Sequence, residues 1–147
     1  MPAQTGAAQG KTTVCLSDQV GWNAAPRITD PSDLGVQDRQ ALANIESAVA
    51  AAGGCRSDIV SLRLYIVGDH IRNARSVREA LLSFFPAENL PTTTWIGVSA
   101  LVSKDFLIEI EAVSVLEYER SLLDPPHVGY QLGYGTRSRV PEVDGKT

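Results

Sequence analysis

The sequence predicts a single α+β domain in which a mixed β-sheet carries two helices on one face. Segments with two-residue alternation and segments with helical periodicity follow one another in the order β-α-β-α-β-β. Both helical segments carry an apolar stripe, as expected of helices that pack on one face of a sheet. A length of 147 residues with 44% hydrophobic residues suffices for one buried core, and no internal repeat is visible.

The first half of the chain supplies a strand, a helix and a second strand. A β-type run at residues 12–18 precedes a loop marked by Gly, Asn, Pro and Asp. Residues 36–52 are predicted to be helical because apolar residues recur at near-helical spacing, at Leu42, Ile45, Val49 and Ala52. Gly53 and Gly54 end this helix. Side chains of residues 59–67 point alternately to the two faces of a strand. This alternation predicts that one face, beneath a helix, carries Val60, Leu62, Leu64 and Ile66.

The second half supplies a helix and two strands. Residues 71–85 are predicted to be helical, with Asp69 as N-cap and an apolar stripe of Ala74, Val77, Leu81 and Phe84. Residues 92–98 and 106–116 are interpreted as the two strands of a β-hairpin. Alternation in the second strand separates Ile108, Ile110 and Ala112 from Leu107, Glu109, Glu111, Val113 and Val115. Two carboxylates therefore share a face with apolar residues.

Composition argues against several classes of protein. A formal net charge of -4 and a pI near 5.1 do not fit a general nucleic-acid binder. No apolar stretch approaches the length of a membrane span and no export signal opens the chain, so a cytoplasmic location is expected. Cys15 and Cys55 are expected to stay reduced. His70 and His127 have no ligand spacing with cysteine or carboxylate, so no metal site is expected.

Short motifs distributed over residues 12–116 carry a family resemblance. In chain order they are Leu16-Ser17-Asp18-Gln19, then Gln37 with Leu42, Asn44 and Ile45, then Ala51-Ala52-Gly53, Asp58-Ile59-Val60, Phe84-Phe85, Pro91-Thr92-Thr93-Thr94 and Ile108-Glu109-Ile110-Glu111-Ala112. Together they resemble the motifs S-G-Q, Q-x-x-x-x-L-x-N-[IV], A-A-G, D-[IV]-V, F-F, P-A-R-[ST] and I-E-I-E-A of the reactive intermediate deaminase superfamily, the Rid or YjgF-type proteins. Each motif is weak alone, but their common order makes the resemblance specific.

The resemblance implies a chorismate-mutase-like fold, assembled as a homotrimer with a ligand cleft between neighbouring subunits. Typical Rid proteins hydrolyse reactive enamines or imines to a carbonyl compound and ammonia without a cofactor. Their arginine clamps the substrate carboxylate, and the first glutamate of I-E-I-E-A positions water. By position, Glu109 inherits the catalytic role, whereas Glu111 is expected to form structural hydrogen bonds or ion pairs. A carboxylate in a partly dry cleft can have its pKa raised enough for this proton transfer.

The chain departs from the family pattern at substrate-binding positions. Thr93 stands where the arginine is expected, and Trp95 stands where relatives often keep a small residue. Asp18 replaces the glycine of S-G-Q, between Ser17 and Gln19. A small carboxylate substrate therefore loses its anchor, and a neutral, cationic or larger substrate is expected. Trp95 either stacks on a flat substrate or fills the cleft.

The two ends and one helix face leave further alternatives. Residues 1–11 are expected to be a flexible terminus, residues 12–117 the Rid-like domain and residues 118–147 a Pro/Gly-rich extension. This extension is either an arm that packs on the trimer surface or stays mobile, or a lid over the cleft. As a lid, it would cover the cleft with Tyr130, Tyr134 or Arg137. The second predicted helix carries an arginine every three residues, at Arg72, Arg75 and Arg78. A helix face that contacts solvent or a neighbouring subunit explains this spacing, so RNA is not an expected partner.

Two hypotheses follow for the function of the chain. The first is a divergent Rid enzyme that acts on a small enamine, imine or related carbonyl compound by deamination, tautomerisation or cyclisation, with Glu109 handling water or a proton. The second is a catalytically silent trimer that binds a metabolite or a protein partner. An intact site around Glu109 favours the enzyme, whereas a cleft filled by Trp95 favours the silent trimer.

Overall fold

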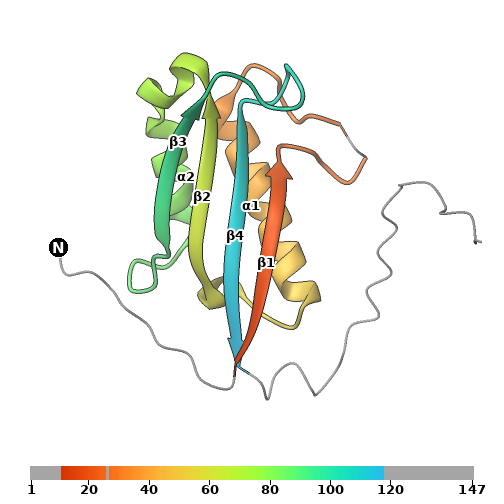
Figure 1. The fold of residues 1–147 in the computed structure, drawn as a ribbon, viewed down its shortest axis with the longest axis vertical. Coiled ribbons are helices and arrows are strands. Elements are labelled where there is room, and N and C mark those ends of the chain that lie inside the picture. The colour runs from red at the N-terminus through yellow and green to blue at the C-terminus, as the bar shows by residue number, and fades with distance from the viewer. Residues whose placement is uncertain (1–10, 26, 118–147) are drawn as a thin grey trace, which may run out of the picture.

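The computed structural model describes residues 11–25 and 27–117 as a four-stranded sheet with two α-helices packed on one face (Figure 1). Between the strands and helices lie two short 3-10 segments. The elements in order are β1 (Lys11–Val20), α1 (Leu34–Ala51), η1 (Arg56–Asp58), β2 (Ile59–Val67), η2 (Gly68–Asn73), α2 (Arg75–Phe84), β3 (Thr92–Val98) and β4 (Ile108–Glu117). The predicted α+β class and element order are confirmed.

The predicted hairpin of the last two strands is wrong. The sheet order is β1-β4-β2-β3, in which β4 runs antiparallel to both β1 and β2 while β3 runs parallel to β2. Residues 99–107 form a connection longer than usual hairpin loops and carry the chain past β2 to the centre of the sheet. Alternation identifies a strand but not its partner, and β2, α2 and β3 here form a parallel crossover unit.

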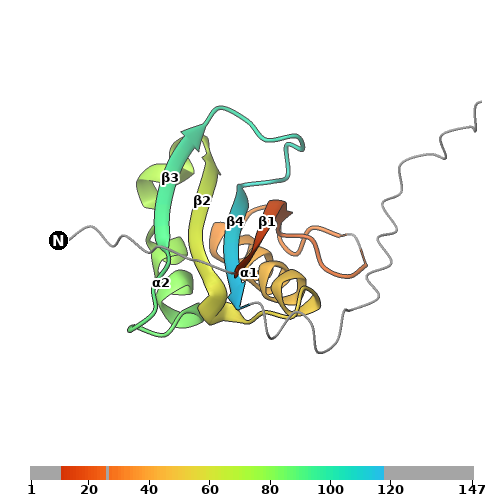
Figure 2. The ribbon, with the colours of Figure 1, turned by 60° about the horizontal axis from the view of Figure 1, so that its bottom comes forward.

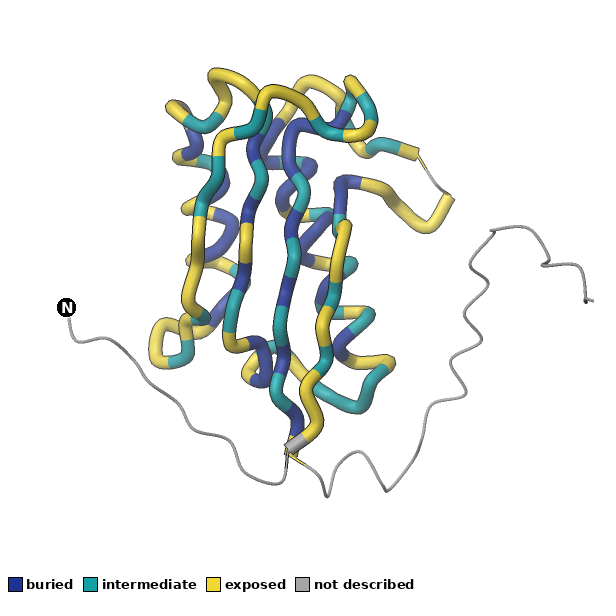
Figure 3. Tube along the Cα trace, in the orientation of Figure 1, coloured by how far each residue is buried: buried dark blue, intermediate teal, exposed yellow. Residues whose placement is uncertain are grey.

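The helices cover one face of the sheet, and within the described part of the chain no element covers the other face, which we call the bare face (Figure 2). Burial alternates along β2 and β4, as the tube in Figure 3 shows. The predicted faces of β4 are confirmed, because Ile108, Ile110 and Ala112 are buried while the intervening residues are only partly buried. One detail of β2 is wrong: Val60 is exposed and Ile59 is buried, because the pairing with β4 shifts between Ile59 and Ser61.

Helix α1 is fixed at both ends by local hydrogen bonds. The Asp33 carboxylate accepts from the backbone N–H of Val36 at 2.9 Å and caps the N-terminus. At the C-terminus Gly53 adopts a φ of 85°, which allows Gly54 N–H to donate to the Val49 carbonyl at 2.9 Å. This left-handed ending at the predicted glycine pair is a Schellman motif. Ala52 is therefore the cap of the helix and not a member of its apolar stripe.

The second helical region is divided into two elements. Residues 68–73 form η2, and α2 begins only at Arg75. The prediction of Asp69 as N-cap is wrong, because the cap position is Ala74, which provides no side-chain hydrogen bond. At the other end, Phe85 is the more deeply buried of the two phenylalanines, at 3% exposure. The apolar stripe is otherwise as predicted, with buried residues Ala74, Val77 and Leu81.

Asp38 is the most deeply buried carboxylic acid among the described residues. Asp38 lies on the buried face of α1 and is 0% exposed. Neither of its carboxylate oxygens has a hydrogen-bond partner. Burial raises the pKa of Asp38 to about 7, against a weaker opposing effect of the Arg39 charge. The fold therefore accommodates this side chain best in its protonated form.

Candidate functional site

The bare face of the sheet carries Glu109 and Glu111 of β4. Strand register places Tyr65 of β2 beside Glu109 and Arg63 beside Glu111. The Tyr65 hydroxyl donates to Glu111 Oε2 at 3.1 Å, and Arg63 Nη1 lies 3.5 Å from the same oxygen. Glu111 is thus held by two partners, in line with the structural role expected for it.

Asp18 is brought to Glu109 by an irregularity in β1. Leu16 pairs with Ala112 and Gln19 with Ile110, so β1 carries one more residue than β4 across this stretch. Asp18 has a φ of 55°, a conformation that Asp tolerates better than most residues and that glycine adopts freely. This geometry accounts for a glycine in the motif that the segment resembles. Here the same turn presents a carboxylate.

Glu109 and Asp18 form an acidic pair on the bare face. The pKa of Glu109 is raised above its ordinary value, first because burial disfavours the charged form. The negative charge of Asp18, a side-chain hydrogen bond with Asp18 and the negative charge of Glu111 raise it further. A protonated Glu109 can therefore donate to Asp18. A carboxyl group with a raised pKa binds its proton more firmly than an ordinary glutamate and is suited to accept and return a proton.

A cavity of about 610 Å³ opens beside this pair, and we call it the carboxylate cavity. Its walls come from the end of β1, the connection between β3 and β4, and the start of β4, namely Asp18, Val20, Trp22, Ala100, Leu101, Val102, Phe106 and Glu109. Trp22 and Phe106 meet edge to face with ring centroids 5.5 Å apart. The cavity thus combines an acidic pair with an apolar and aromatic wall, a combination typical of small-molecule sites.

Two polar residues of α1 hold the walls of this cavity in place. The Gln37 amide donates to the carbonyls of Asp30 and Asp105 at 2.7 and 2.8 Å and accepts from Leu107 N–H at 2.9 Å. Asn44 donates to the carbonyls of Val20 and Trp22 at 3.0 and 2.9 Å. Both residues belong to the helix motif identified in the sequence. Their function is to join β1 and the segment before β4 to α1.

The other predicted binding residues line a second cavity on the helix side of the sheet. Thr93 and Trp95 pair with Leu62 and Leu64, which are buried beneath the helices. They contribute to a cavity of about 470 Å³ between α2 and the edge strand β3. We call this cavity the α2–β3 groove, and its lining residues are Arg78, Leu81, Leu82, Phe85, Leu90, Pro91, Thr93 and Trp95. Trp95 packs partly against the core and leaves this groove open.

In one chain, therefore, the predicted site residues do not all meet. Asp18 and Glu109 share the carboxylate cavity, whereas Thr93 and Trp95 lie on the opposite side of the sheet. Gln19 folds back on its own strand, because its amide donates to the Ser17 carbonyl at 2.7 Å. The predicted lid residues lie outside the described part of the chain, namely Tyr130, Tyr134 and Arg137.

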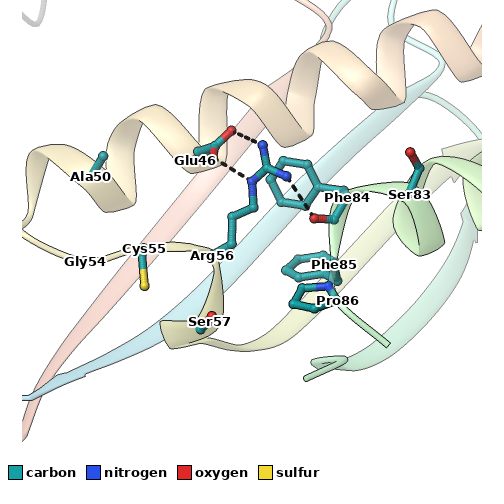
Figure 4. A pocket seen from close by; sticks show the side chains of 10 residues that line it. All are labelled: Glu46, Ala50, Gly54, Cys55, Arg56, Ser57, Ser83, Phe84, Phe85 and Pro86. Atoms are coloured by element: carbon teal, nitrogen blue, oxygen red, sulfur yellow. Dashed lines mark hydrogen bonds and ion pairs between the residues drawn. The ribbon is translucent and has the colours of Figure 1, made fainter. Parts of the chain in front are cut away.

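A third hollow, of about 580 Å³, lies near the C-terminal ends of α1 and α2 and is shown in Figure 4. Its central side chain is Arg56, which donates to both carboxylate oxygens of Glu46 at 2.6 and 2.8 Å and to the Phe84 carbonyl at 3.0 Å. The guanidinium also lies 4.2 Å from the centroid of the Phe84 ring. Because these contacts engage Arg56 from three sides, the hollow is a structural joint between the helices.

Sequence reasoning missed several residues that shape the two cavities. Trp22 and Phe106 form the aromatic wall of the carboxylate cavity, and Arg78 borders the α2–β3 groove. Gln37 had a usable signal, since an amide on the buried face of a helix needs partners. Among residues 11–25 and 27–117 no group of three or more His, Cys, Asp and Glu is arranged to hold a metal ion. Within the same ranges no helix is long and apolar enough to cross a membrane.

The fold and the acidic strand motif define a Rid-type protein, and the comparisons with known proteins agree. Residues 4–116 match the family described as Endoribonuclease L-PSP. The chain belongs to this family, the Rid or YjgF-type family.

Individual relatives lie at moderate sequence distance. A Rid-family protein of Yersinia pestis, YyfB, is 34% identical, with a TM-score of 0.66 over 71% of this chain and 78% of its own. A member of the YjgF/YER057c/UK114 family from Mycobacterium tuberculosis is 30% identical, with a TM-score of 0.61 over 71% and 79%. A 2-iminobutanoate/2-iminopropanoate deaminase of Dermatophagoides farinae is 28% identical over 76% of this chain and 84% of its own.

Proposed function

We propose that this protein is a divergent Rid enzyme that acts on a small enamine, imine or related carbonyl compound. The reaction is hydrolytic deamination, tautomerisation or cyclisation, and Glu109 handles the water or the proton. The observation that carries this proposal is the acidic pair of Glu109 and Asp18 beside the carboxylate cavity, with the pKa of Glu109 raised. The similarity to an imine deaminase supports the same reaction class.

For an imine, the chemistry requires proton transfers at the water, the nitrogen and the carbinolamine hydroxyl. With the imine nitrogen protonated, Glu109 as carboxylate takes a proton from water while the water oxygen bonds to the imine carbon. Glu109 returns this proton to the nitrogen of the carbinolamine, and the C–N bond then breaks, so that ammonia leaves with the bonding pair while the hydroxyl proton passes back to Glu109 and the carbonyl forms. A glutamate with a raised pKa suits both steps, because it holds the proton well enough to return it. Asp18 favours the protonated form of Glu109 and lies beside it as a hydrogen-bond partner.

We further propose that the complete site lies between copies of the chain in a homotrimer. The bare sheet face carries partly buried apolar residues beside the Arg63–Glu111 ion pair, a surface that a second copy would cover. The carboxylate cavity and the α2–β3 groove lie on opposite sides of one sheet, so a substrate that touches both needs a second copy to supply one of them. The α2–β3 groove opens at the edge strand, where such a copy can reach it.

Oligomeric state tests this arrangement directly. Multi-angle light scattering of the full chain at low micromolar concentration is expected to give the mass of three copies. A monomer mass would refute the shared site, because the carboxylate cavity would then never meet Thr93 and Trp95.

Glu109→Gln tests the catalytic role, because it removes the base and keeps nearly the same shape. A panel of neutral, cationic and carboxylate-bearing imines, enamines and cyclic carbonyl compounds is assayed for ammonia or product release. The wild type is expected to turn over at least one compound, and Glu109→Gln to lose that activity while remaining a trimer. Glu111→Gln is the matched control on the same strand face, and is expected to retain most of the activity.

The alternative is a catalytically silent trimer that binds a metabolite or a protein partner. Under it, no compound in the panel turns over and Glu109→Gln alters only stability or binding. Equal rates for the wild type and Glu109→Gln on a compound that does turn over would eliminate Glu109 as the proton-handling residue.

A further inference from the structure

The α2–β3 groove is built from one stripe of α2 facing the edge strand. Arg78, Leu81 and Leu82 stand at positions i, i+3 and i+4 on one side of α2, and Phe85 follows as the residue that caps its C-terminus. Thr93 and Trp95 of β3 provide the opposite wall, and Leu90 and Pro91 close one end. Leu82 and Leu90 remain 52% and 43% exposed, so the groove presents an uncovered apolar lining. Within it Arg78 is the only charged residue and Thr93 the only hydroxyl.

Arg78 differs from the neighbouring arginines in having no partner. Arg75 pairs with Glu79 at 2.8 Å, and Arg72 lies 3.7 Å from Asp69. No hydrogen bond, ion pair or ring contact of the Arg78 side chain occurs within the described part of the chain. Arg78 thus keeps all its guanidinium donors available at the border of an apolar groove.

We propose that Arg78 is the anion-binding residue of the α2–β3 groove and that the ligand of this groove is a compound with a flat apolar body and a single carboxylate. This inference rests on the proposed function, since it names the substrate class of the same site. At the position of Thr93 on β3 the chain has no cation, and Arg78 on α2 provides a cation to the same groove. The expectation of a neutral or cationic substrate is thereby replaced by that of a larger carboxylate.

The chemistry of the lining selects this class of ligand. A planar guanidinium binds a carboxylate through two parallel hydrogen bonds, and such charge-assisted bonds are stronger than neutral ones. The groove offers one cation, which matches a monoanion better than a dianionic phosphate. The indole of Trp95 and the side chains of Leu81 and Phe85 suit a flat apolar body. A volume of about 470 Å³ exceeds what a carboxylate with a one- or two-carbon chain would fill.

The test compares one ligand pair that differs in charge, phenylacetate and phenylacetamide. The chain has two tryptophans, so a Trp22→Phe background leaves Trp95 as the fluorescent reporter inside the groove. Phenylacetate is expected to bind this protein more tightly than phenylacetamide. Arg78→Gln is expected to weaken phenylacetate binding about tenfold, the low end for a charge-assisted contact, and to change phenylacetamide binding less than about threefold.

Matched variants separate a specific contact from general charge. Arg75→Gln removes an arginine from the same helix outside the groove lining, and is expected to leave both affinities unchanged. Arg78→Lys keeps the charge without the planar fork and is expected to fall between the wild type and Arg78→Gln. In the double variant Arg78→Gln with Thr93→Arg, a cation returns to the groove from β3, and phenylacetate affinity is expected to recover.

Failure of this inference is distinguishable from failure of the proposed function. Equal affinities of the wild type for the two ligands, no binding of either at about 10 mM, or an unchanged phenylacetate affinity in Arg78→Gln would each overturn the role of Arg78. None of these results depends on turnover, which is tested by Glu109→Gln. Conversely, selective phenylacetate binding that needs Arg78 upholds the inference even in a protein that turns over no compound in the panel.

Discussion

Replacement of Asp38 by asparagine should make the protein more stable at neutral and alkaline pH. Asp38 is fully buried on α1, and both its oxygens lack a hydrogen-bond partner. Its pKa is raised from 3.8 to about 7, so the folded state holds a proton that the unfolded state has released over this range. Because the folded state binds more protons, stability falls as pH rises from about 4 to about 7.

The size of the effect follows from that shift. Each pKa unit corresponds to about 1.4 kcal/mol, so the charged form of Asp38 destabilises the fold by at most about 4 kcal/mol above pH 7. Below pH 4 the side chain is protonated in both states and this penalty is absent. Asp38→Asn keeps the size and polarity of the protonated acid but never ionises. The stability difference between the variant and the wild type should therefore grow by up to about 1.4 kcal/mol per pH unit across this range.

Urea unfolding followed by circular dichroism at pH 5, 6, 7 and 8, at one fixed protein concentration, measures this difference. Subtraction of the two curves removes the contributions of all other titrating groups. Asp69→Asn is the matched control for the same substitution at a surface position, because the Asp69 side chain is 99% exposed. A flat difference for Asp38→Asn would refute the reasoning, since it would mean that Asp38 has the same pKa in both states.

Three further outcomes are expected. If the wild type has activity, Asp18→Asn should lower the apparent pKa of the acidic limb of its pH–rate profile. The reason is that the variant removes a negative charge that raises the pKa of Glu109. An unchanged apparent pKa would show that Asp18 does not influence the titration of Glu109. Gln37→Leu should destabilise the fold by about 2 to 4 kcal/mol in urea unfolding, since Leu107 N–H and two carbonyls lose their partner; a change below about 0.5 kcal/mol would contradict this. Arg56→Gln should cost about 1 kcal/mol in the same assay, because its ion pair is roughly 40% exposed, and high salt should reduce that cost; a salt-independent cost would argue against the ion pair.

Local patterns in the sequence predicted the elements and their faces well. Alternation separated Ile108 and Ile110 from the carboxylates on the other face of their strand, and the glycine pair after α1 marked its end. These features depend on neighbours a few residues apart, so periodicity and turn chemistry capture them. The prediction of Asp69 as an N-cap was wrong because a 3-10 segment lies between it and the start of α2. The prediction that Val60 faces the helices was wrong because an irregularity in strand pairing places Ile59 there instead.

Features that depend on distant partners were beyond the sequence patterns. The position of β4 between β1 and β2 depends on which backbones pair, and alternation does not encode the partner. The closeness of Asp18 to Glu109, which raises the pKa of Glu109, depends on the same pairing. Arg78 was predicted as part of a solvated or intersubunit face, and its place beside Thr93 emerges only when α2 is packed against β3. The chemistry of single residues was readable, whereas their grouping required the fold.

The sheet order has a consequence for how the chain folds. β1 precedes the other described strands in the chain, yet its only strand partner within residues 11–117 as described is β4, with Val20 opposite Glu109 and Lys11 opposite Glu117. During translation β2, α2 and β3 can assemble as a local unit, while β1 waits for nearly the whole domain to be made. The sheet then closes by insertion of its last strand at the centre, a step dominated by long-range contacts and therefore slow. Until that step, the nascent chain exposes strand edges that chaperones would have to shield from aggregation.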